Sequence, residues 1–280
     1  MKVCADIKTL KQKIKEYGLQ RKSIGFIPTM GALHAGHLSL IQQARKENDI
    51  VVVSVFVNPK QFTNPDDLLR YPRTLERDTA LIEGVADVLF SPAVEEVYPE
   101  GSDTTVEVGE LGRVSEGIYR PGHFNGMATV VLKLFNIIKP NRAYFGKKDY
   151  QQYLIVQHMV RDLNLEIVIV GCETLRSPTG LALSSRNTRL SEEEQGKARV
   201  IYRALASAQK IVRAGEQSVL KVRERMSQVL SFEPSWKTEY IEIRSIEDFL
   251  EVQNIDSDVA ILIAGYIGEV RLIDNMEVKV

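Results

Sequence analysis

The stretch IGFIPTMGALHAGH, residues 24–37, predicts a buried strand that turns into a helix through a glycine-containing loop. Residues 24–27 form an apolar run typical of a short strand, and apolar side chains then recur at helical spacing over residues 38–44. His34 and His37 therefore fall at the N-terminus of that helix. Because free backbone N–H groups and the positive end of the helix dipole gather there, this turn predicts a phosphate site.

The histidine pair admits two interpretations. A single histidine at a helix terminus is more often a surface or capping residue than a ligand. His34 and His37, however, lie three positions apart in a chain with only four histidines, so both can project from one helix face toward one anion. Gly36 between them lets a ligand approach the backbone. We therefore favour an anion site over a pair of capping residues.

Composition limits the classes of function. With 280 residues, 44% of them apolar, the chain is long enough to bury a core and to form one large domain and a smaller one. Its 36 basic and 37 acidic residues give a formal net charge of -1, which favours neither nucleic-acid binding nor disorder. The expected ligands are small molecules, with no nucleic-acid or membrane partner.

Cysteine usage and the first residues favour a cytoplasmic protein. Cys4 and Cys172 are the only cysteines and form no C-x-x-C pair, which argues against a disulfide framework and against a thiolate zinc site. Residues 1–20 resemble an amphipathic helix and lack the apolar core of a signal peptide. No segment approaches the roughly 18 uninterrupted apolar residues of a membrane span.

A second stretch, IVVVSVFV at residues 50–57, is typical of a strand buried on both faces of a parallel sheet, and we place it at the sheet centre. Further strands are predicted at residues 87–90, 143–145 and 167–170, and helices at residues 75–83, 127–138 and 150–163. Because strands and helices alternate, the sequence predicts an α/β fold with a doubly wound parallel sheet.

The pattern changes after residue 177. Ser191 and Glu194 form a capping box that opens a long helix. A second helix is predicted at residues 218–230, and strands at residues 240–243, 259–264 and 270–273. We therefore expect a large domain at residues 1–177, a smaller α+β domain at residues 188–280, and a hinge or lid in the polar residues 178–187.

The residues Asn58-Pro59-Lys60-Gln61-Phe62 follow the central strand directly, at the edge where open α/β sheets bind ligands. The amide of Gln61 both donates and accepts hydrogen bonds, which suits a hydroxy acid. An ordinary Asn-Pro turn explains the same residues equally well.

Two further polar clusters are candidate phosphate contacts. Residues 146–149, GKKD, follow a strand and open a helix, which places glycine and lysine beside a helix N-terminus. Residues 183–187, LSSRN, concentrate two hydroxyls, an arginine and an amide, as a mobile phosphate clamp requires. The alternatives are solvated lysines with Asp149 as a plain N-cap, and a solvated loop.

Five blocks together resemble the pantoate-β-alanine ligase family: PTMGALHAGH at 28–37, FVNPKQF at 56–62, RPGHFNGMATVV at 120–131, YFGKKDYQQ at 144–152 and GLALSSRN at 180–187. The H-x-G-H motif alone resembles the wider nucleotidylyltransferase superfamily, whose Rossmann-like fold agrees with the predicted sheet. Lys147 departs from the family, which more often has Glu or Gln there. That departure bears on nucleotide affinity rather than on the chemistry.

The resemblance implies an ATP-dependent condensation of pantoate with β-alanine, which yields pantothenate, AMP and pyrophosphate through a pantoyl-adenylate intermediate. It also implies Mg2+, carried mostly on the phosphates, with Asp78 as a candidate ligand. A homodimer is implied as well. His123 and Asn125 are expected to brace the pocket as loop and cap residues.

The resemblance further implies roles for single residues. The catalytic positions are His34, His37 and Lys148, where we favour charge stabilisation over proton donation by His37, the position treated as an acid. Gln61 and Gln152 hold pantoate, with Gln61 also near the β-alanine. The implied ATP site consists of Met30, Gly31, Ala32, Leu33, His34, Ala35, Gly36, His37, Gly146, Lys147, Lys148, Asp149, Leu175, Leu183, Ser184, Ser185 and Arg186.

Two other functions stay open at this point. A nucleotidylyltransferase that keeps the nucleotide on its product would also use the H-x-G-H motif, and release of free AMP would distinguish it from the ligase. A non-catalytic nucleotide-binding regulator on the same sheet would bind ATP without turnover. The intact histidines, lysine and SSRN loop argue against the regulator.

Overall fold

The computed structural model describes residues 1–280 and forms two compact units, Met1–Glu173 and Thr174–Val280. The predicted hinge or lid, residues 178–187, belongs to the second unit. None of the helices combines the length and the apolar character needed to cross a membrane.

The first unit is built on a parallel sheet of six strands in the order β1-β4-β3-β2-β5-β6, which confirms the predicted fold class. The strand with the continuous apolar run, β3, pairs with β2 at the centre, as expected. The strands are β1 (Lys2–Cys4), β2 (Ile24–Thr29), β3 (Ile50–Val55), β4 (Val88–Phe90), β5 (Arg142–Gly146) and β6 (Val168–Cys172).

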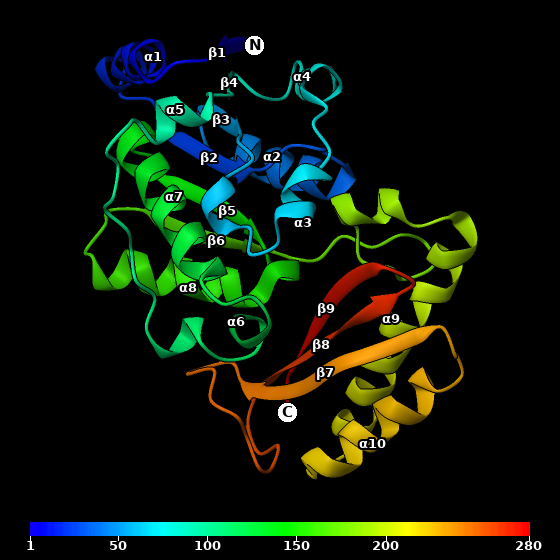
Figure 1. Cartoon of the computed structure of the whole chain (residues 1–280). Coiled ribbons are helices and arrows are strands. Elements are labelled where there is room, and N and C mark those ends of the chain that lie inside the picture. Colours follow the sequence, from blue (N-terminus) through cyan, green and yellow to red (C-terminus); the bar gives the residue numbers. More distant parts are fainter. The chain divides into compact units, whose positions relative to one another are not determined.

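Helices cover both faces of this sheet (Figure 1). Phe26 and Val52 pack into a core with residues of α1, α7 and α8, whereas their neighbours Ile27 and Val53 pack into a second core with residues of α2 and α4. The two cores follow from the alternation of side chains along each strand. The helices are α1 (Ile7–Leu19), α2 (Ala35–Glu47), α3 (Pro65–Leu69), α4 (Leu75–Ile82), α5 (Val94–Val97), α6 (Glu116–Tyr119), α7 (His123–Ile138) and α8 (Tyr150–Asp162).

Strand β1 was not predicted, because the sequence analysis assigned all of residues 1–20 to a helix. This strand has only three residues and pairs with β4 alone, at the edge of the sheet. Lys2 and Val3 are exposed and Cys4 is buried, so the segment carries too few apolar residues for a strand pattern.

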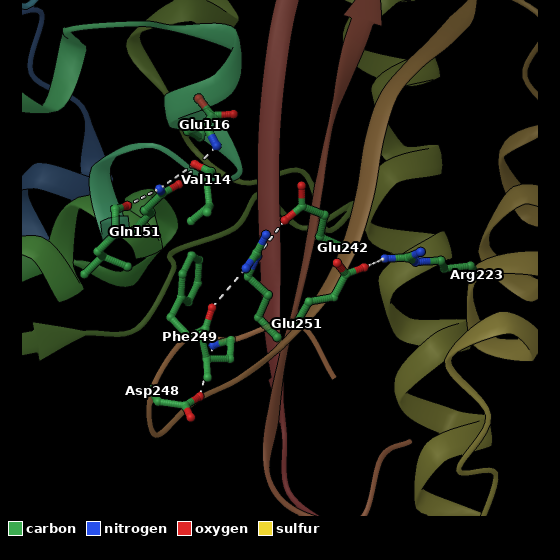
Figure 2. A network of polar contacts seen from close by, with 11 residues as sticks. Val114, Glu116, Gln151, Arg223, Glu242, Asp248, Phe249 and Glu251 are labelled. Carbon is green, nitrogen blue, oxygen red and sulfur yellow. Dashed lines mark hydrogen bonds and ion pairs between the residues drawn. The ribbon is translucent and has the colours of Figure 1, made fainter. Parts of the chain in front are cut away.

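The second unit contains an antiparallel sheet in the order β7-β8-β9, packed against two long helices. Its elements are α9 (Glu192–Arg213), α10 (Val219–Leu230), β7 (Trp236–Ser245), β8 (Val259–Ile267) and β9 (Val270–Val278). Ser191 and Glu194 form the predicted capping box at the start of α9. At the surface Arg223 of α10 pairs with Glu251 at 2.8 Å (Figure 2).

Candidate active site

The loop between β2 and α2 holds the first group of candidate residues at the carboxyl end of the sheet. Gly31 and Ala32 adopt left-handed backbone conformations, with φ of 82° and 50°. A Cβ atom at Gly31 would also lie 2.9 Å from Val55 Cγ1, so this position requires glycine. The Gly31 N–H donates to Thr29 Oγ1 at 3.1 Å, which secures the start of the loop.

Asp78 of α4 fixes the middle of this loop. Its carboxylate is fully buried and accepts hydrogen bonds from the backbone N–H groups of Ala32 and Leu33, both at 2.8 Å. The Thr74 hydroxyl donates to the same carboxylate at 3.1 Å. Asp78 was a candidate magnesium ligand, whereas in the structure its oxygens accept hydrogen bonds from the loop. No group of three or more His, Cys, Asp or Glu side chains is placed to hold a metal ion.

His34 and His37 form a capping box at the N-terminus of α2. His34 Nδ1 accepts from the Gly36 N–H at 3.1 Å, and His37 Nδ1 accepts from the His34 N–H at 3.3 Å. Because both Nδ1 atoms are acceptors, each neutral ring carries its proton on Nε2. The rings lie 4.1 Å apart. Capping and anion binding, which the sequence analysis treated as alternatives, are therefore compatible: each ring caps with one nitrogen and keeps an N–H donor on the other.

The surroundings of the histidines keep both rings neutral. Burial, followed by the charge of Lys148, lowers the pKa of His34 from 6.5 to about 4. Burial, followed by the neighbouring His34, lowers the pKa of His37 to about 3. Protonation would also turn each Nδ1 into a donor and break the capping bond that it accepts. At neutral pH the pair thus offers N–H donors rather than positive charge.

The positive charge comes from the loop after β5, which lies beside β2 in the sheet. The ammonium of Lys148 is close enough to His34 to lower its pKa, and it lies 3.8 Å from Asp149 Oδ1. Lys147 pairs with Glu173 at 2.9 Å. Asp149 stands at the N-cap position of α8 but accepts no capping bond from that helix. Of the two lysines, only Lys148 is thus linked electrostatically to the histidine pair, where Asp149 acts in the opposite direction and Arg77 adds a smaller positive contribution at His34.

Gln61 lies in a buried polar cluster next to the β2–α2 loop. Its side chain is 6% exposed, and its Nε2 atom donates to Met30 Sδ at 3.1 Å. Its Oε1 atom accepts from Asn58 Nδ2 at 3.0 Å. The predicted Asn-Pro turn is present as a short 3-10 turn, Pro59–Gln61, capped by Asn58. The structure thus brings the FVNPKQF segment to the loop that carries the histidines.

The neighbouring glutamines of α8 have different surroundings. Gln151 is buried and holds the segment before and at the start of α6, because it donates to the Val114 carbonyl at 2.8 Å and accepts from the Glu116 N–H at 3.1 Å (Figure 2). Gln152, the predicted substrate residue, is half-buried in the first turn of α8, and its side chain forms no hydrogen bond within the protein. Of the two, only Gln152 has an amide that is available to a ligand.

His123 and Asn125, expected to brace the pocket, both bond to backbone groups. His123 Nδ1 lies 2.7 Å from the Gln61 carbonyl, which can only accept, so His123 is the donor. Asn125 Oδ1 accepts from the Val108 N–H at 2.9 Å. These contacts agree with a positioning role for both residues.

The remaining candidate residues lie in the second unit. Leu175 is 41% exposed, and its carbonyl accepts from the Leu183 N–H at 3.0 Å. Ser184 Oγ accepts from the Arg186 N–H at 3.2 Å and so caps a short 3-10 turn, Ser185–Arg189. The segment is anchored to its own unit by Arg176, whose guanidinium forms two bonds, of 2.6 Å and 3.0 Å, with the buried carboxylate of Asp274.

Three residues near the loop were not assigned their roles from sequence: Asp78, Asn58 and Tyr98. Tyr98 follows α5, and its hydroxyl donates to Asn58 Oδ1 at 3.0 Å. Asp78 and Tyr98 act across 40 or more positions of the chain. A single sequence carries no pattern for such pairs, although the place of Asn58 just after the central strand was a signal for it.

Comparison with protein families gives a match over nearly the whole chain. The model of the family described as Pantoate-beta-alanine ligase matches residues 2–277. A protein named pantothenate synthetase from Desulfitobacterium hafniense is 48% identical over 276 residues, which cover 98% of both chains. Another of that name, from Aquifex aeolicus, is also 48% identical and covers 98% of this chain and 97% of its own.

Solved structures agree with these matches. Pantothenate synthetase from Thermus thermophilus superposes with a TM-score of 0.94 at 46% identity and covers 100% of both chains. Pantoate-beta-alanine ligase from Francisella tularensis, complexed with beta-gamma ATP and beta-alanine, has a TM-score of 0.80 at 39% identity and covers 99% of this chain and 97% of its own.

Proposed function

The chain belongs to the pantoate-beta-alanine ligase family, and from that premise we propose how its residues carry out the reaction. It condenses pantoate with β-alanine to form pantothenate, with ATP as the third substrate. A transferase that keeps the nucleotide on its product and a non-catalytic regulator are therefore set aside. The observation that carries the residue assignment is the histidine capping box, which holds two Nε2–H donors beside Lys148.

The first step is the attack of the pantoate carboxylate on the α-phosphorus of ATP, with pyrophosphate as the leaving group. Negative charge gathers on the phosphoryl oxygens, so this step needs fixed donors and cations more than it needs covalent chemistry. His34 and His37 supply N–H donors, Lys148 supplies charge, and the N-terminus of α2 adds the helix dipole. The product is pantoyl adenylate.

His37 acts by stabilising charge rather than by giving up a proton. Its pKa of about 3 describes proton loss from the imidazolium, and at neutral pH very little of His37 is in that protonated form. A neutral imidazole that lost its Nε2 proton would become an anion beside the phosphates. An approaching polyphosphate raises the pKa of both rings, but the capping bonds on Nδ1 oppose their protonation.

Pantoate binds at Gln61 and Gln152, with Gln61 also near the β-alanine. The amide N–H groups of Gln61 face away from Asn58, and those of Gln152 have no partner within the protein. Amides of this kind suit the hydroxyl and carboxylate oxygens of a hydroxy acid. In the second step the β-alanine amine attacks the acyl carbon of pantoyl adenylate, which releases AMP.

Residues 178–187 serve as a lid that keeps water from the mixed anhydride, with Ser184, Ser185 and Arg186 on the phosphates and Leu175 near the adenine. Of the two earlier interpretations, hinge and lid, the contacts favour the lid. Arg176 ties the start of the segment to Asp274, and Asn187 Nδ2 donates to the Ala182 carbonyl at 3.0 Å. The segment is thus held within the second unit.

Magnesium arrives with ATP as part of the substrate. The protein has no cluster of carboxylates for a resident ion, and the Asp78 carboxylate is occupied by the loop. We place the ion on the phosphates, where Mg2+ keeps most of its water.

We further propose that the enzyme is a cytoplasmic homodimer, as the family resemblance implies. Both cysteines are unpaired, which agrees with a reducing compartment. Light scattering on the purified chain tests the dimer, because a monomer mass would contradict it.

The test of the chemistry is to supply ATP, magnesium and pantoate, with and without β-alanine, and to follow pyrophosphate, AMP and pantothenate. The adenylate route predicts that pyrophosphate exchanges into ATP with pantoate alone. Free AMP and pantothenate should then accumulate together only when β-alanine is added. AMP release without pantothenate, or no exchange with pantoate, would contradict this route.

A further inference from the structure

We propose that Tyr98 is a positioning residue for pantoate, because it helps to orient the Asn58 amide that fixes the side chain of Gln61. The inference rests on the proposed role of Gln61 in binding pantoate. It assigns a function to a tyrosine 37 positions further along the chain than Gln61.

The orientation of the Asn58 amide is determined by its partners. Its side chain is 1% exposed. The Oδ1 atom accepts from the Lys60 N–H at 3.3 Å and from the Tyr98 hydroxyl at 3.0 Å, and Nδ2 donates to the Gly126 carbonyl at 3.0 Å. A backbone N–H can only donate and a carbonyl can only accept, so the flipped amide would face two repulsive contacts.

The Asn58 amide then orients Gln61. Asn58 Nδ2 donates to Gln61 Oε1 at 3.0 Å, so the oxygen of Gln61 points into the cluster and its NH₂ group points away, toward Met30. His123 holds the Gln61 backbone at the same time through its carbonyl. Gln61 therefore presents donors to a ligand, as a carboxylate or hydroxyl oxygen requires.

Tyr98 supplies the shorter of the two bonds to Asn58 Oδ1, and it is the only side chain that bonds to this oxygen. Burial raises the pKa of Tyr98 to about 12, so its hydroxyl stays protonated and able to donate. The ring is held independently of the hydroxyl, since Lys60 Nζ lies 4.5 Å and Lys133 Nζ 5.3 Å from its centre. Loss of the hydroxyl should thus loosen the side-chain amides of Asn58 and Gln61 and leave the ring of Tyr98 in place.

The test is Tyr98→Phe, alone and combined with Gln61→Ala, with KM measured separately for pantoate and ATP. We expect Tyr98→Phe to raise the KM for pantoate about fivefold, the effect of one lost neutral hydrogen bond. The KM for ATP and kcat should stay within about twofold. In the Gln61→Ala background, Tyr98→Phe should have no further effect, because the residue through which it acts is gone.

Tyr17→Phe is the matched control. Tyr17 is a half-buried tyrosine of α1 whose hydroxyl forms no hydrogen bond, so its loss should leave both KM values unchanged. A merely structural role for Tyr98 would lower the melting temperature and raise both KM values, in both backgrounds. That result would overturn the inference.

The outcomes separate the two levels of the proposal. If Gln61→Ala leaves the KM for pantoate unchanged, the pantoate site is wrong and the inference about Tyr98 falls with it. If Gln61→Ala raises this KM but Tyr98→Phe does not, only the role of Tyr98 is refuted. A measurement independent of turnover is the NMR signal pair of the Gln61 NH₂ group, identified by its loss in Gln61→Ala. It should shift in Tyr98→Phe, and an unchanged pair would also refute the role of Tyr98.

Discussion

The two units hold their candidate residues by different means. In the first unit, side chains from distant segments bond to the site: Asp78 holds the loop, and Tyr98 holds Asn58, the residue that fixes Gln61. In the second unit, the hydroxyl and arginine candidates are held by bonds within a few positions of the chain, such as Arg186 N–H to Ser184 Oγ. One long-range ion pair, Arg176 with Asp274, anchors their segment.

The difference predicts that the candidate residues of the first unit are organised before the substrate arrives and that those of the second unit adjust afterwards. Buried networks with every partner assigned cost little reorganisation during the reaction. A surface turn with local bonds can change its contacts more cheaply. We therefore expect changes in the first unit to affect the chemical step most, and changes in the second unit to affect anchoring and closure.

The largest effect is expected for Lys148→Ala. It removes the cation beside the histidines and should slow pantoate-dependent pyrophosphate exchange roughly 100- to 1,000-fold, as the loss of one transition-state contact does. Lys147→Ala is the matched control, because that lysine pairs with Glu173, and its rate should stay within about threefold. If both variants lost the same fraction of the exchange rate, Lys148 would have no special role beside the histidines, and the proposed preorganised site would be contradicted.

Arg176→Ala tests the anchor of the second unit. It leaves the carboxylate of Asp274, 3% exposed, without its partner and should lower the free energy of unfolding by about 3 kcal/mol. Arg223→Ala breaks the more exposed pair with Glu251 and should cost less than about 1 kcal/mol. Denaturant titration measures both, and similar losses would show that the anchor is no stronger than a surface pair.

Asp78→Asn tests the support of the loop in the first unit. The amide places N–H groups against the Ala32 or Leu33 N–H, which should lower the free energy of unfolding by about 2 kcal/mol and raise the KM for ATP. Asp66→Asn, at an exposed carboxylate, should change neither quantity. If added magnesium corrected the KM for ATP in Asp78→Asn, Asp78 would be a metal ligand after all.

The smallest effect is the pH dependence from the histidines. Their pKa values in the folded protein lie below 6.5, so the unfolded chain binds more protons and stability falls as pH decreases from 6.5 toward 4. Because both rings are partly exposed, we expect a loss of about 1 kcal/mol between pH 7 and pH 5. Urea titrations at the two pH values measure it. The variant with His34→Asn and His37→Gln should lack this component, and an identical loss in it would assign the effect to other groups.

The apolar patterns of the sequence predicted most of the fold. The apolar run at residues 50–57 predicted the central strand, which in the structure ends at Val55. The capping box of Ser191 and Glu194 predicted the start of α9. These features depend on neighbours within one element. Strand β1 was missed because its three residues are defined by pairing with β4, which lies more than 80 positions away.

The candidate site, like the fold, was predictable only where its features depend on local sequence. The positions of the histidines and of Gln61 at the carboxyl ends of β2 and β3 follow from the order of strands and turns. The partners that orient them do not, since Asp78 and Tyr98 are brought in by tertiary folding. The sequence could therefore indicate which residues meet a ligand, but not which atoms they present to it.

The histidine capping box also constrains how this motif can change in evolution. Each ring caps α2 with Nδ1 and keeps a donor on Nε2, so a substitution can lose one role and keep the other. Asn at position 34 and Gln at position 37 are ordinary capping residues, and they would preserve the helix while removing the imidazoles. A descendant with this pair would keep the capped helix while it lost the two Nε2–H donors, so loss of the chemistry would leave no mark on the stability of the fold.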